Sequence, residues 1–221
     1  MKLSAYILLM NILFLPACCF AKNAPALPSW TTWKESKHIK VDYKNIDASD
    51  LIEIKAKATI KSSLSGFILF IQDTQNINQW LDNVHSSNVL NVVTPQENIF
   101  ITHFNRYWPI SERYMVVTSR YWQNSDLSLE ISMRDINNER YLEKDKIKIE
   151  VKKAHWRIQP NKDNTITIEY TVIADPKGKI PVWLTKRLSL NGLWKTMNNL
   201  QEQLPLSRWQ SHTIENIKEL N

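Results

Sequence analysis

At Asp175-Pro176-Lys177-Gly178-Lys179-Ile180-Pro181-Val182-Trp183-Leu184, a segment rich in β-branched residues gives way to a long amphipathic one. Pro176 fixes its own φ angle, and Gly178 permits a positive φ that other residues rarely adopt. Pro181 lacks the backbone N–H that the first turn of a helix would leave unpaired. The stretch therefore predicts a rigid turn that sets the direction of a helix beginning near Pro181.

The segment after this turn has the apolar spacing of one long helix. Its apolar residues recur at helical intervals and form a wide stripe. The stripe consists of Leu184, Leu188, Leu193, Met197, Leu200 and Leu204, widened by Trp183, Leu190 and Trp194. Pro205 then stops the pattern. A stripe of this width predicts a helix that packs against a larger apolar surface.

Strand patterns dominate the chain before the turn. Between Leu51 and Lys61 apolar residues alternate with charged ones, which is typical of a strand with one solvent-facing side. Segments rich in β-branched and aromatic residues, separated by Asn, Asp and Pro clusters, predict further strands. These cover residues 89–93, 99–104, 114–122, 127–133, 147–158 and 166–174. Near Lys152 and Lys153 the apolar positions change from odd to even, which predicts a β-bulge.

The order of these segments indicates the fold class. Residues 63–84 have apolar spacings of three and four, so we expect two short helices or one broken helix there. No break in composition divides the chain from Trp30 onward, so one domain is expected. An antiparallel sheet that curls needs an apolar cover for its concave face, and the last helix can supply it. We therefore predict an α+β fold with a curved antiparallel sheet wrapped around the long C-terminal helix.

Composition narrows the classes of function. Only 3 of the 221 residues are glycine, which excludes the Gly-rich loops that cradle phosphates, whereas the 9 tryptophans suit broad apolar walls. The formal net charge of +6 permits an anionic membrane surface as a partner. The basic residues are scattered rather than interleaved with aromatics, so no nucleic-acid partner is expected. The five histidines lack metal-ligand spacing, so we expect no metal and no cofactor.

The N-terminus has the pattern of a secretory leader. A short positive start precedes an apolar run over residues 5–15, and small residues follow up to Ala21. We expect a signal peptide over residues 1–21 and a linker over residues 22–32, which makes the protein exported and periplasmic. Cys18 and Cys19 both lie in this leader, so the cleaved chain has no disulfide. A second interpretation is a lipoprotein anchored through Cys18, because Leu-Pro-Ala-Cys at residues 15–18 resembles a lipobox.

Two motifs resemble a known family. Residues 175–184 are similar to the Asp-Pro-x-Gly-x-Ile-Pro-x-Trp-Leu sequence that leads into the last helix of StAR-related lipid-transfer (START) domains. Residues 107–113 resemble that family's Pro-Trp-Pro segment, although Tyr107 replaces its first proline and Tyr114 its aspartate. The resemblance extends from about Trp33 to Leu204. It implies a START-like lipid-binding domain over residues 33–205, followed by a C-terminal tail over residues 206–221.

The resemblance also implies a helix-grip fold, with a cavity between the sheet and the last helix for one lipid or similar hydrophobic molecule. We expect the walls of this cavity to include Trp108, Trp122, Met133, Trp156, Trp183 and Met197. Arg113 is the candidate contact for a polar head group, because an arginine that faces an apolar cavity must be paired or must meet a ligand. The alternative for Arg113 is an outward, solvated position.

Two classes of function remain, and fold alone does not separate them. We favour a monomeric, non-catalytic carrier or sensor of a hydrophobic ligand in the cell envelope, with no catalytic residues. The alternative is an envelope enzyme of the cyclase or hydrolase type built on the same cavity. An enzyme should place a titratable group with a perturbed pKa in the pocket, and the sequence offers no obvious one. A third possibility, an adaptor without ligand, requires a cavity filled by side chains.

The leader prediction is tested by N-terminal sequencing of the protein recovered from the periplasm. We expect Lys22 as the first residue, because the small residues that a signal peptidase accepts end at Ala21. A diacylated Cys18 at the N-terminus would instead establish the lipoprotein interpretation. A chain that keeps Met1 and stays inside the cell would contradict both.

Overall fold

The computed structural model describes residues 29–106 and 111–220. The predicted signal peptide, most of the predicted linker and Trp108 lie outside these residues. Within them, ten strands form one sheet in the order β1-β2-β3-β10-β9-β7-β6-β5-β4, with β8 beside β6. All neighbouring strands are antiparallel except β8, which pairs with β6 in parallel. The described part of the chain thus has the predicted antiparallel sheet.

The bounds of β3, β5, β6, β7 and β10 lie within two residues of the sequence pattern, whereas β4 begins five residues before its predicted range and β1 and β2 precede the first predicted strand. The strands are β1 Thr31–Glu35, β2 Ile39–Asn45, β3 Ile52–Lys61, β4 Val84–Thr94, β5 Glu97–Phe104, β6 Arg113–Gln123, β7 Leu129–Asp135, β8 Ile147–Lys148, β9 Glu150–Pro160 and β10 Thr165–Asp175. The helices are α1 Leu64–Gln72 and α2 Val182–Gln203, with 3₁₀ turns η1 Thr74–Gln79, η2 Glu139–Tyr141, η3 Leu204–Leu206 and η4 Arg208–Ser211. The α1–η1 pair is the predicted broken helix. β1 includes the last two residues, 31 and 32, of the segment expected to be a linker.

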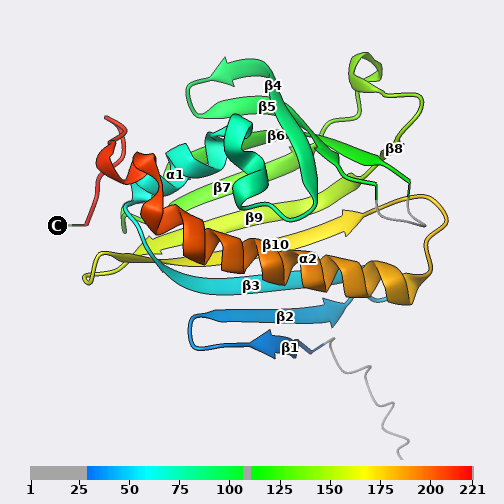
Figure 1. The fold of residues 1–221 in the computed structure, drawn as a ribbon, viewed down its shortest axis with the longest axis horizontal. Coiled ribbons are helices and arrows are strands. Elements are labelled where there is room, and N and C mark those ends of the chain that lie inside the picture. Colours follow the sequence, from blue (N-terminus) through cyan, green and yellow to red (C-terminus); the bar gives the residue numbers. More distant parts are fainter. Residues whose placement is uncertain (1–28, 107–110, 221) are drawn as a thin grey trace, which may run out of the picture.

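The long helix α2 lies across the sheet over β2 and β3 (Figure 1). Pro181 stands immediately before its first residue, and the Pro181 carbonyl accepts the backbone N–H groups of Leu184 and Thr185. The second half of the helix is buried, with Met197 and Leu200 fully inaccessible. At the other edge, β4 and β5 curl over toward α1, and β4 packs against η1 (Figure 1). The curved sheet wrapped around a C-terminal helix is the predicted helix-grip arrangement.

The predicted β-bulge is confirmed. Ile173 of β10 pairs with Lys153 of β9, but the next residue, Ala174, pairs with Val151. Lys152 is therefore the extra residue, at the place where the apolar pattern changes phase. The bulge keeps Val151 and Ala154 on the inner face of the sheet, where both are buried.

Strand β3 shows how the sequence separates the two faces of the sheet. Its even-numbered residues from Ile54 to Ile60 are buried, as the alternation predicts. Glu53, on the opposite face, is nevertheless only 6% exposed. Its carboxylate lies 2.7 Å from Lys44 Nζ and 2.7 Å from Lys153 Nζ. Burial alone would raise the pKa of Glu53, but these two lysines outweigh it and lower the pKa, so the carboxylate stays charged and ties β2, β3 and β9 together.

The C-terminal residues pack back on the domain. The Glu219 carboxylate accepts the backbone N–H groups of Leu64 and Ser65, at 2.9 and 2.8 Å, and so satisfies two unpaired donors at the start of α1. Lys218 exchanges hydrogen bonds with the side chain of Gln123 at the end of β6. The segment predicted to be a tail is thus attached to both a helix and the sheet. None of the helices in the described residues is long and apolar enough to cross a membrane.

Candidate ligand-binding cavity

A cavity of about 310 Å³ lies between the concave face of the sheet, the α1–η1 segment and α2. Its walls are mostly apolar. They are formed by Ile68, Ile71, Gln72, Thr74, Ile77, Trp80, Leu81, Asp82, Ser87, Val89, Asn98, Phe100, Thr102, Phe104, Met115, Ser119, Tyr121, Ile131, Met133, Ile149, Val151, Ala154, Trp156, Tyr170, Val172, Ala174, Ser189, Gly192, Leu193 and Thr196. An adaptor without ligand would require side chains to fill this interior, and they do not fill it. It is instead a space that can hold an apolar molecule.

An aromatic group forms one part of this wall. The Trp156 indole stacks on the Tyr170 ring, with centroids 4.0 Å apart and planes 23° apart. Trp80 and Trp156 form a T-shaped pair, with centroids 6.5 Å apart and planes at 78°. Burial raises the pKa of the Tyr170 hydroxyl, so this group is an uncharged phenol at neutral pH. These rings give the cavity a rigid surface, because each is fixed by its neighbour.

The structure places two of the predicted wall residues at the cavity. Met133 and Trp156 both line the cavity, from β7 and β9. Met197 does not line it: the side chain is completely buried in the main apolar core. The helix stripe faces the sheet as predicted, but where Met197 lies it packs directly on the sheet side chains, so no space remains for a ligand. Trp108 falls outside the described residues.

Two further predicted wall residues, Trp122 and Trp183, are exposed and do not line the cavity. Trp122 is 40% exposed, whereas its neighbour Tyr121 lines the cavity. Successive residues of a strand point to opposite faces, so Tyr121 lies on the inner face and Trp122 on the outer face. Trp183 is 65% exposed in the first turn of α2, which is one of the least buried parts of the helix.

Arg113 is buried and lies outside the residues that line the cavity, so the structure does not place it where the predicted head-group contact would be. Its guanidinium donates to three backbone carbonyls: Nη1 to Ser111 at 2.7 Å, Nε to Pro176 at 3.1 Å and Nη2 to Lys177 at 3.3 Å. Burial lowers the pKa of this guanidinium from its ordinary value, although it stays protonated. Arg113 thus joins the two sequence motifs to each other.

Gly178 is required at the same place. Its φ is +75°, which other residues rarely adopt. A Cβ at this position would lie 3.0 Å from Ile147 Cδ1 and 3.4 Å from Arg113 Nη2. Arg113 therefore holds the turn by hydrogen bonds, and position 178 has no room for a residue larger than glycine.

The sequence analysis missed the polar residues on the cavity wall. Asn98 and Thr102 on β5 alternate with Phe100 and Phe104, so all four share the inner face. Ser119 of β6 lies opposite Asn98. The sequence of β5 does not mark these residues, because each of its two faces mixes polar and apolar side chains and the period-two pattern does not identify the inner face.

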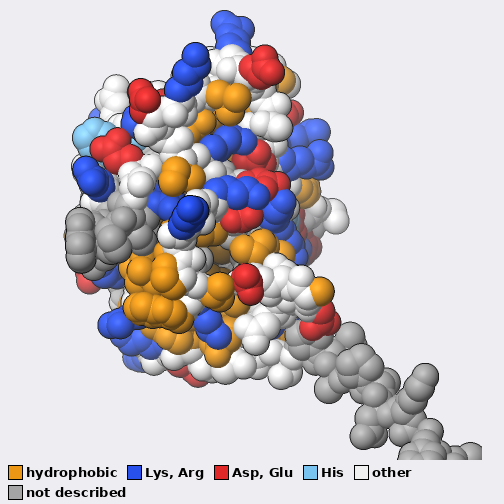
Figure 2. Space-filling view, turned by 90° about the vertical axis from the view of Figure 1, so that its right-hand side faces the viewer, with side chains coloured by type: hydrophobic (Ala, Val, Ile, Leu, Met, Phe, Trp, Pro, Cys, Tyr) orange, Lys and Arg blue, Asp and Glu red, His pale blue; other side chains and the backbone are white. Residues whose placement is uncertain are grey.

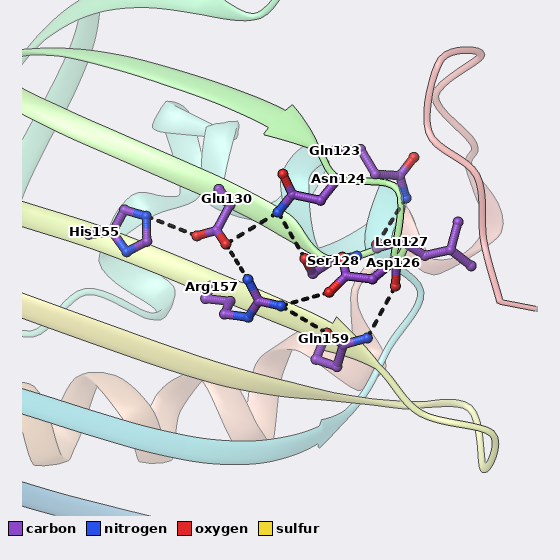
Figure 3. A network of polar contacts seen from close by, with 9 residues as sticks. All are labelled: Gln123, Asn124, Asp126, Leu127, Ser128, Glu130, His155, Arg157 and Gln159. Carbon is purple, nitrogen blue, oxygen red and sulfur yellow. Dashed lines mark hydrogen bonds and ion pairs between the residues drawn. The ribbon is translucent and has the colours of Figure 1, made fainter.

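A second polar network lies on the outer face of the sheet, away from the cavity (Figure 3). Arg157 Nη1 donates to Glu130 Oε1 at 2.6 Å and Arg157 Nη2 to Asp126 Oδ2 at 2.8 Å, while His155 Nε2 lies 2.9 Å from Glu130 Oε2. Burial lowers the pKa of Arg157, but the carboxylates of Glu130 and Asp126 outweigh it, so the pKa is raised. The network braces β7 against β9. Within the described residues no group of three or more His, Cys, Asp or Glu side chains could hold a metal ion.

The fold and the cavity together define the class of this protein: a helix-grip domain with an apolar interior site. The START domain family model matches residues 19–210, so the chain belongs to the START domain family.

Solved structures share the fold. A STAR-related lipid transfer protein from Xanthomonas axonopodis is 24% identical and has a TM-score of 0.71, with 79% of this chain and 98% of that chain covered. Human StAR-related lipid transfer protein 5 is 12% identical with a TM-score of 0.73, covering 80% of this chain and 86% of that one. The human StarD13 lipid transfer and protein localization domain is 15% identical with a TM-score of 0.69, at 80% and 90% coverage. A search of curated proteins finds no match.

The structural role of Arg113 is tested by Arg113→Met, which keeps the length of the side chain but removes its donors. We expect the free energy of unfolding to fall by about 3 kcal/mol, because three carbonyls lose a charged partner. Chemical denaturation measures this change. Arg134→Met, on an exposed residue of β7, is the matched control and should change stability by less than about 0.5 kcal/mol. An Arg113→Met protein as stable as the original would contradict the role.

Proposed function

We propose that this protein binds one lipid or similar hydrophobic molecule in the cavity under α2 and carries or presents it without chemical change. The observation that carries the proposal is the 310 Å³ apolar space between the sheet and α2 in a START domain. Removal of apolar ligand surface from water contributes about 25 cal/mol per Å² before the costs of ordering, so such a space favours apolar ligands. The names of the Xanthomonas and human neighbours, which are lipid transfer proteins, support the same function.

The chemistry of the wall favours binding over catalysis. Among the described lining residues there is no His, Cys, Lys, Arg or Glu, and the carboxylate of Asp82 lies 3.7 Å from Lys195 Nζ. General acid–base catalysis needs a titratable group within reach of the substrate. The uncharged phenol of Tyr170 and the hydroxyls of the wall are suited to hydrogen bonding with a ligand. We therefore propose a carrier or sensor rather than an enzyme.

The proposed place of action is the cell envelope. The leader over residues 1–21 supports export, because it combines a positive start, an apolar run and a small-residue end. The first turn of α2 supports contact with a membrane, since Val182 and Trp183 are 46% and 65% exposed. Lys179 and Arg187 are exposed on either side of them. Figure 2 views this end of the molecule, where apolar side chains gather on one side among scattered charges. An apolar surface flanked by cations is suited to an anionic bilayer.

The binding site is tested by Gly192→Leu, which adds a side chain from α2 to the cavity. A leucine side chain at this lining position takes up space that a ligand would fill, so we expect affinity for the neutral dye Nile red to fall at least tenfold. Stability should stay the same or rise by up to about 1 kcal/mol, because glycine weakens a helix and a Cβ here meets only Asp82 Oδ2 at 3.6 Å.

Glu202→Leu is the control for this experiment, because it adds the same side chain to an exposed position of α2. It should leave dye affinity unchanged. Equal dye binding by the Gly192→Leu protein and the original would place the hydrophobic site elsewhere and contradict the proposal.

Membrane contact is tested by Trp183→Ala in a vesicle sedimentation assay with phosphatidylglycerol. Because a tryptophan at a bilayer surface buries roughly 150–250 Å², we expect at least a tenfold loss of binding. Trp122→Ala, on the outer face of the sheet, is the matched control and should bind as the original does. Retention of full binding by the Trp183→Ala protein would show that α2 does not contact the bilayer.

A further inference from the structure

Three polar side chains form a connected row on the outer face of the sheet: Ser86, His103 and Glu143. Ser86 of β4 and His103 of β5 lie directly opposite each other in the strand register. Ser86 Oγ lies 3.4 Å from His103 Nδ1, and His103 Nε2 lies 2.7 Å from Glu143 Oε1. The adjacent residues Ser87 and Thr102 line the cavity, and successive residues of a strand point to opposite faces. The row is therefore separated from the proposed ligand site by the sheet itself.

The carboxylate of Glu143 decides which nitrogen of His103 carries the proton. A carboxylate only accepts hydrogen bonds, so Nε2 must donate to it, and Nδ1 of the neutral ring is left as an acceptor. Nδ1 then faces the Ser86 hydroxyl, which can donate to it. Burial raises the pKa of Glu143, but hydrogen bonds from His103 and Lys146 outweigh this effect and lower the pKa, so the carboxylate stays charged.

Tyr114 of β6 fixes both partners of this pair. Its hydroxyl oxygen accepts the backbone N–H of Glu143 at 2.9 Å, and Tyr114 is only 1% exposed. Its ring also lies beside the His103 imidazole, with the two centroids 6.3 Å apart. One buried side chain thus holds the carboxylate and the imidazole in a defined relative position, which is what a pre-arranged reactive group requires.

The row is accessible from solvent. The side chains of His103 and Glu143 are 16% and 31% exposed, and Ser86 is partly exposed. β4 is the last strand in the sheet order, so among the described residues its backbone N–H groups that point away from β5 have no strand partner. N–H donors of this kind stabilise the oxyanion that forms when a hydroxyl attacks a carbonyl group. Because the row lies on a surface rather than in the cavity, it is suited to small substrates.

We propose that Ser86, His103 and Glu143 form a nucleophilic site that hydrolyses small, uncharged carboxylic esters. A hydroxyl beside an imidazole that a carboxylate orients is the arrangement that activates serine. Ser86 Oγ attacks the carbonyl carbon while its proton passes to His103 Nδ1, and the bond to the alcohol oxygen then breaks as the alcohol leaves with this proton. Water attacks the acyl group on Ser86 in the same way, which releases the carboxylic acid and returns a proton to Ser86 Oγ.

The activity is tested with p-nitrophenyl acetate and the full chain, by the release of p-nitrophenol at pH 8. Ser86→Ala and His103→Gln should each lower kcat/KM by about tenfold or more, because the nucleophile or its base is lost. Ser132→Ala is the matched control and should keep full activity. Ser132 also lies opposite a histidine, His155, on the outer face, but among the described residues no hydrogen bond joins them. Hydrolysis by the Ser86→Ala protein equal to that of the original would overturn the proposal.

Glu143 acts through His103 and is a positioning residue. Glu143→Gln keeps the size of the side chain, but an amide can donate as well as accept, so it no longer fixes the proton on Nε2. We expect kcat to fall by about fivefold or more while KM stays unchanged. An unchanged kcat would remove Glu143 from the site. Nile red binding in the cavity should be unchanged in all these variants, which separates loss of this site from loss of the fold.

The nucleophile itself is identified by covalent trapping with diisopropyl fluorophosphate. Phosphorylation of an activated serine forms a bond from Oγ to phosphorus and releases fluoride and a proton. Mass spectrometry of the digested protein should find this adduct on Ser86, and His103→Gln should prevent its formation. An adduct on another residue, or an unlabelled Ser86 in the folded original protein, would overturn the proposal.

Discussion

The guanidinium of Arg113 is the constraint from which the binding site follows. A buried cation must find acceptors, and this one finds them in the carbonyls of Ser111, Pro176 and Lys177. Two of these belong to the turn before α2, so the start of β6 fixes the direction of the helix. Gly178 allows the turn to pass this close to Arg113. Because α2 then leaves the sheet at one end and packs tightly at the other, a space remains between them.

The pleat of the sheet separates two kinds of chemistry within single strands. On β9, Trp156 lines the cavity while its neighbours His155 and Arg157 join the outer network (Figure 3). Charged groups on the outer face can therefore brace the strands without entering the apolar space. The pairs along β9 show why the cavity can stay uncharged in a chain with a net charge of +6.

The sequence was sufficient for the fold because strand alternation, the phase change at Lys152 and the turn around Gly178 are local signals. It was less informative about the site. Of the predicted wall residues, Met133 and Trp156 line the cavity, whereas the equally apolar Trp122 and Trp183 are exposed. Periodicity separates the two faces of a strand, but it does not show which face lines the cavity when both faces carry aromatic residues. Likewise, a buried arginine can pair with a ligand or with a backbone turn, and only the three-dimensional placement of residues 176–177 decides between them.

The attachment of Glu219 to the start of α1 has a consequence for the order of folding. The two capped N–H groups belong to Leu64 and Ser65, and β3 finds its partner β10 only after most of the chain has been made. Contacts between such distant residues form slowly, because the entropy cost of closing a long loop comes before the contact stabilises the chain. The start of α1 is therefore held by a residue that lies 155 positions from Leu64 and 154 positions from Ser65 in the chain. Leu64 and Ser65 can be capped in this way only once Glu219 has been synthesised, so this contact is among the later ones to form.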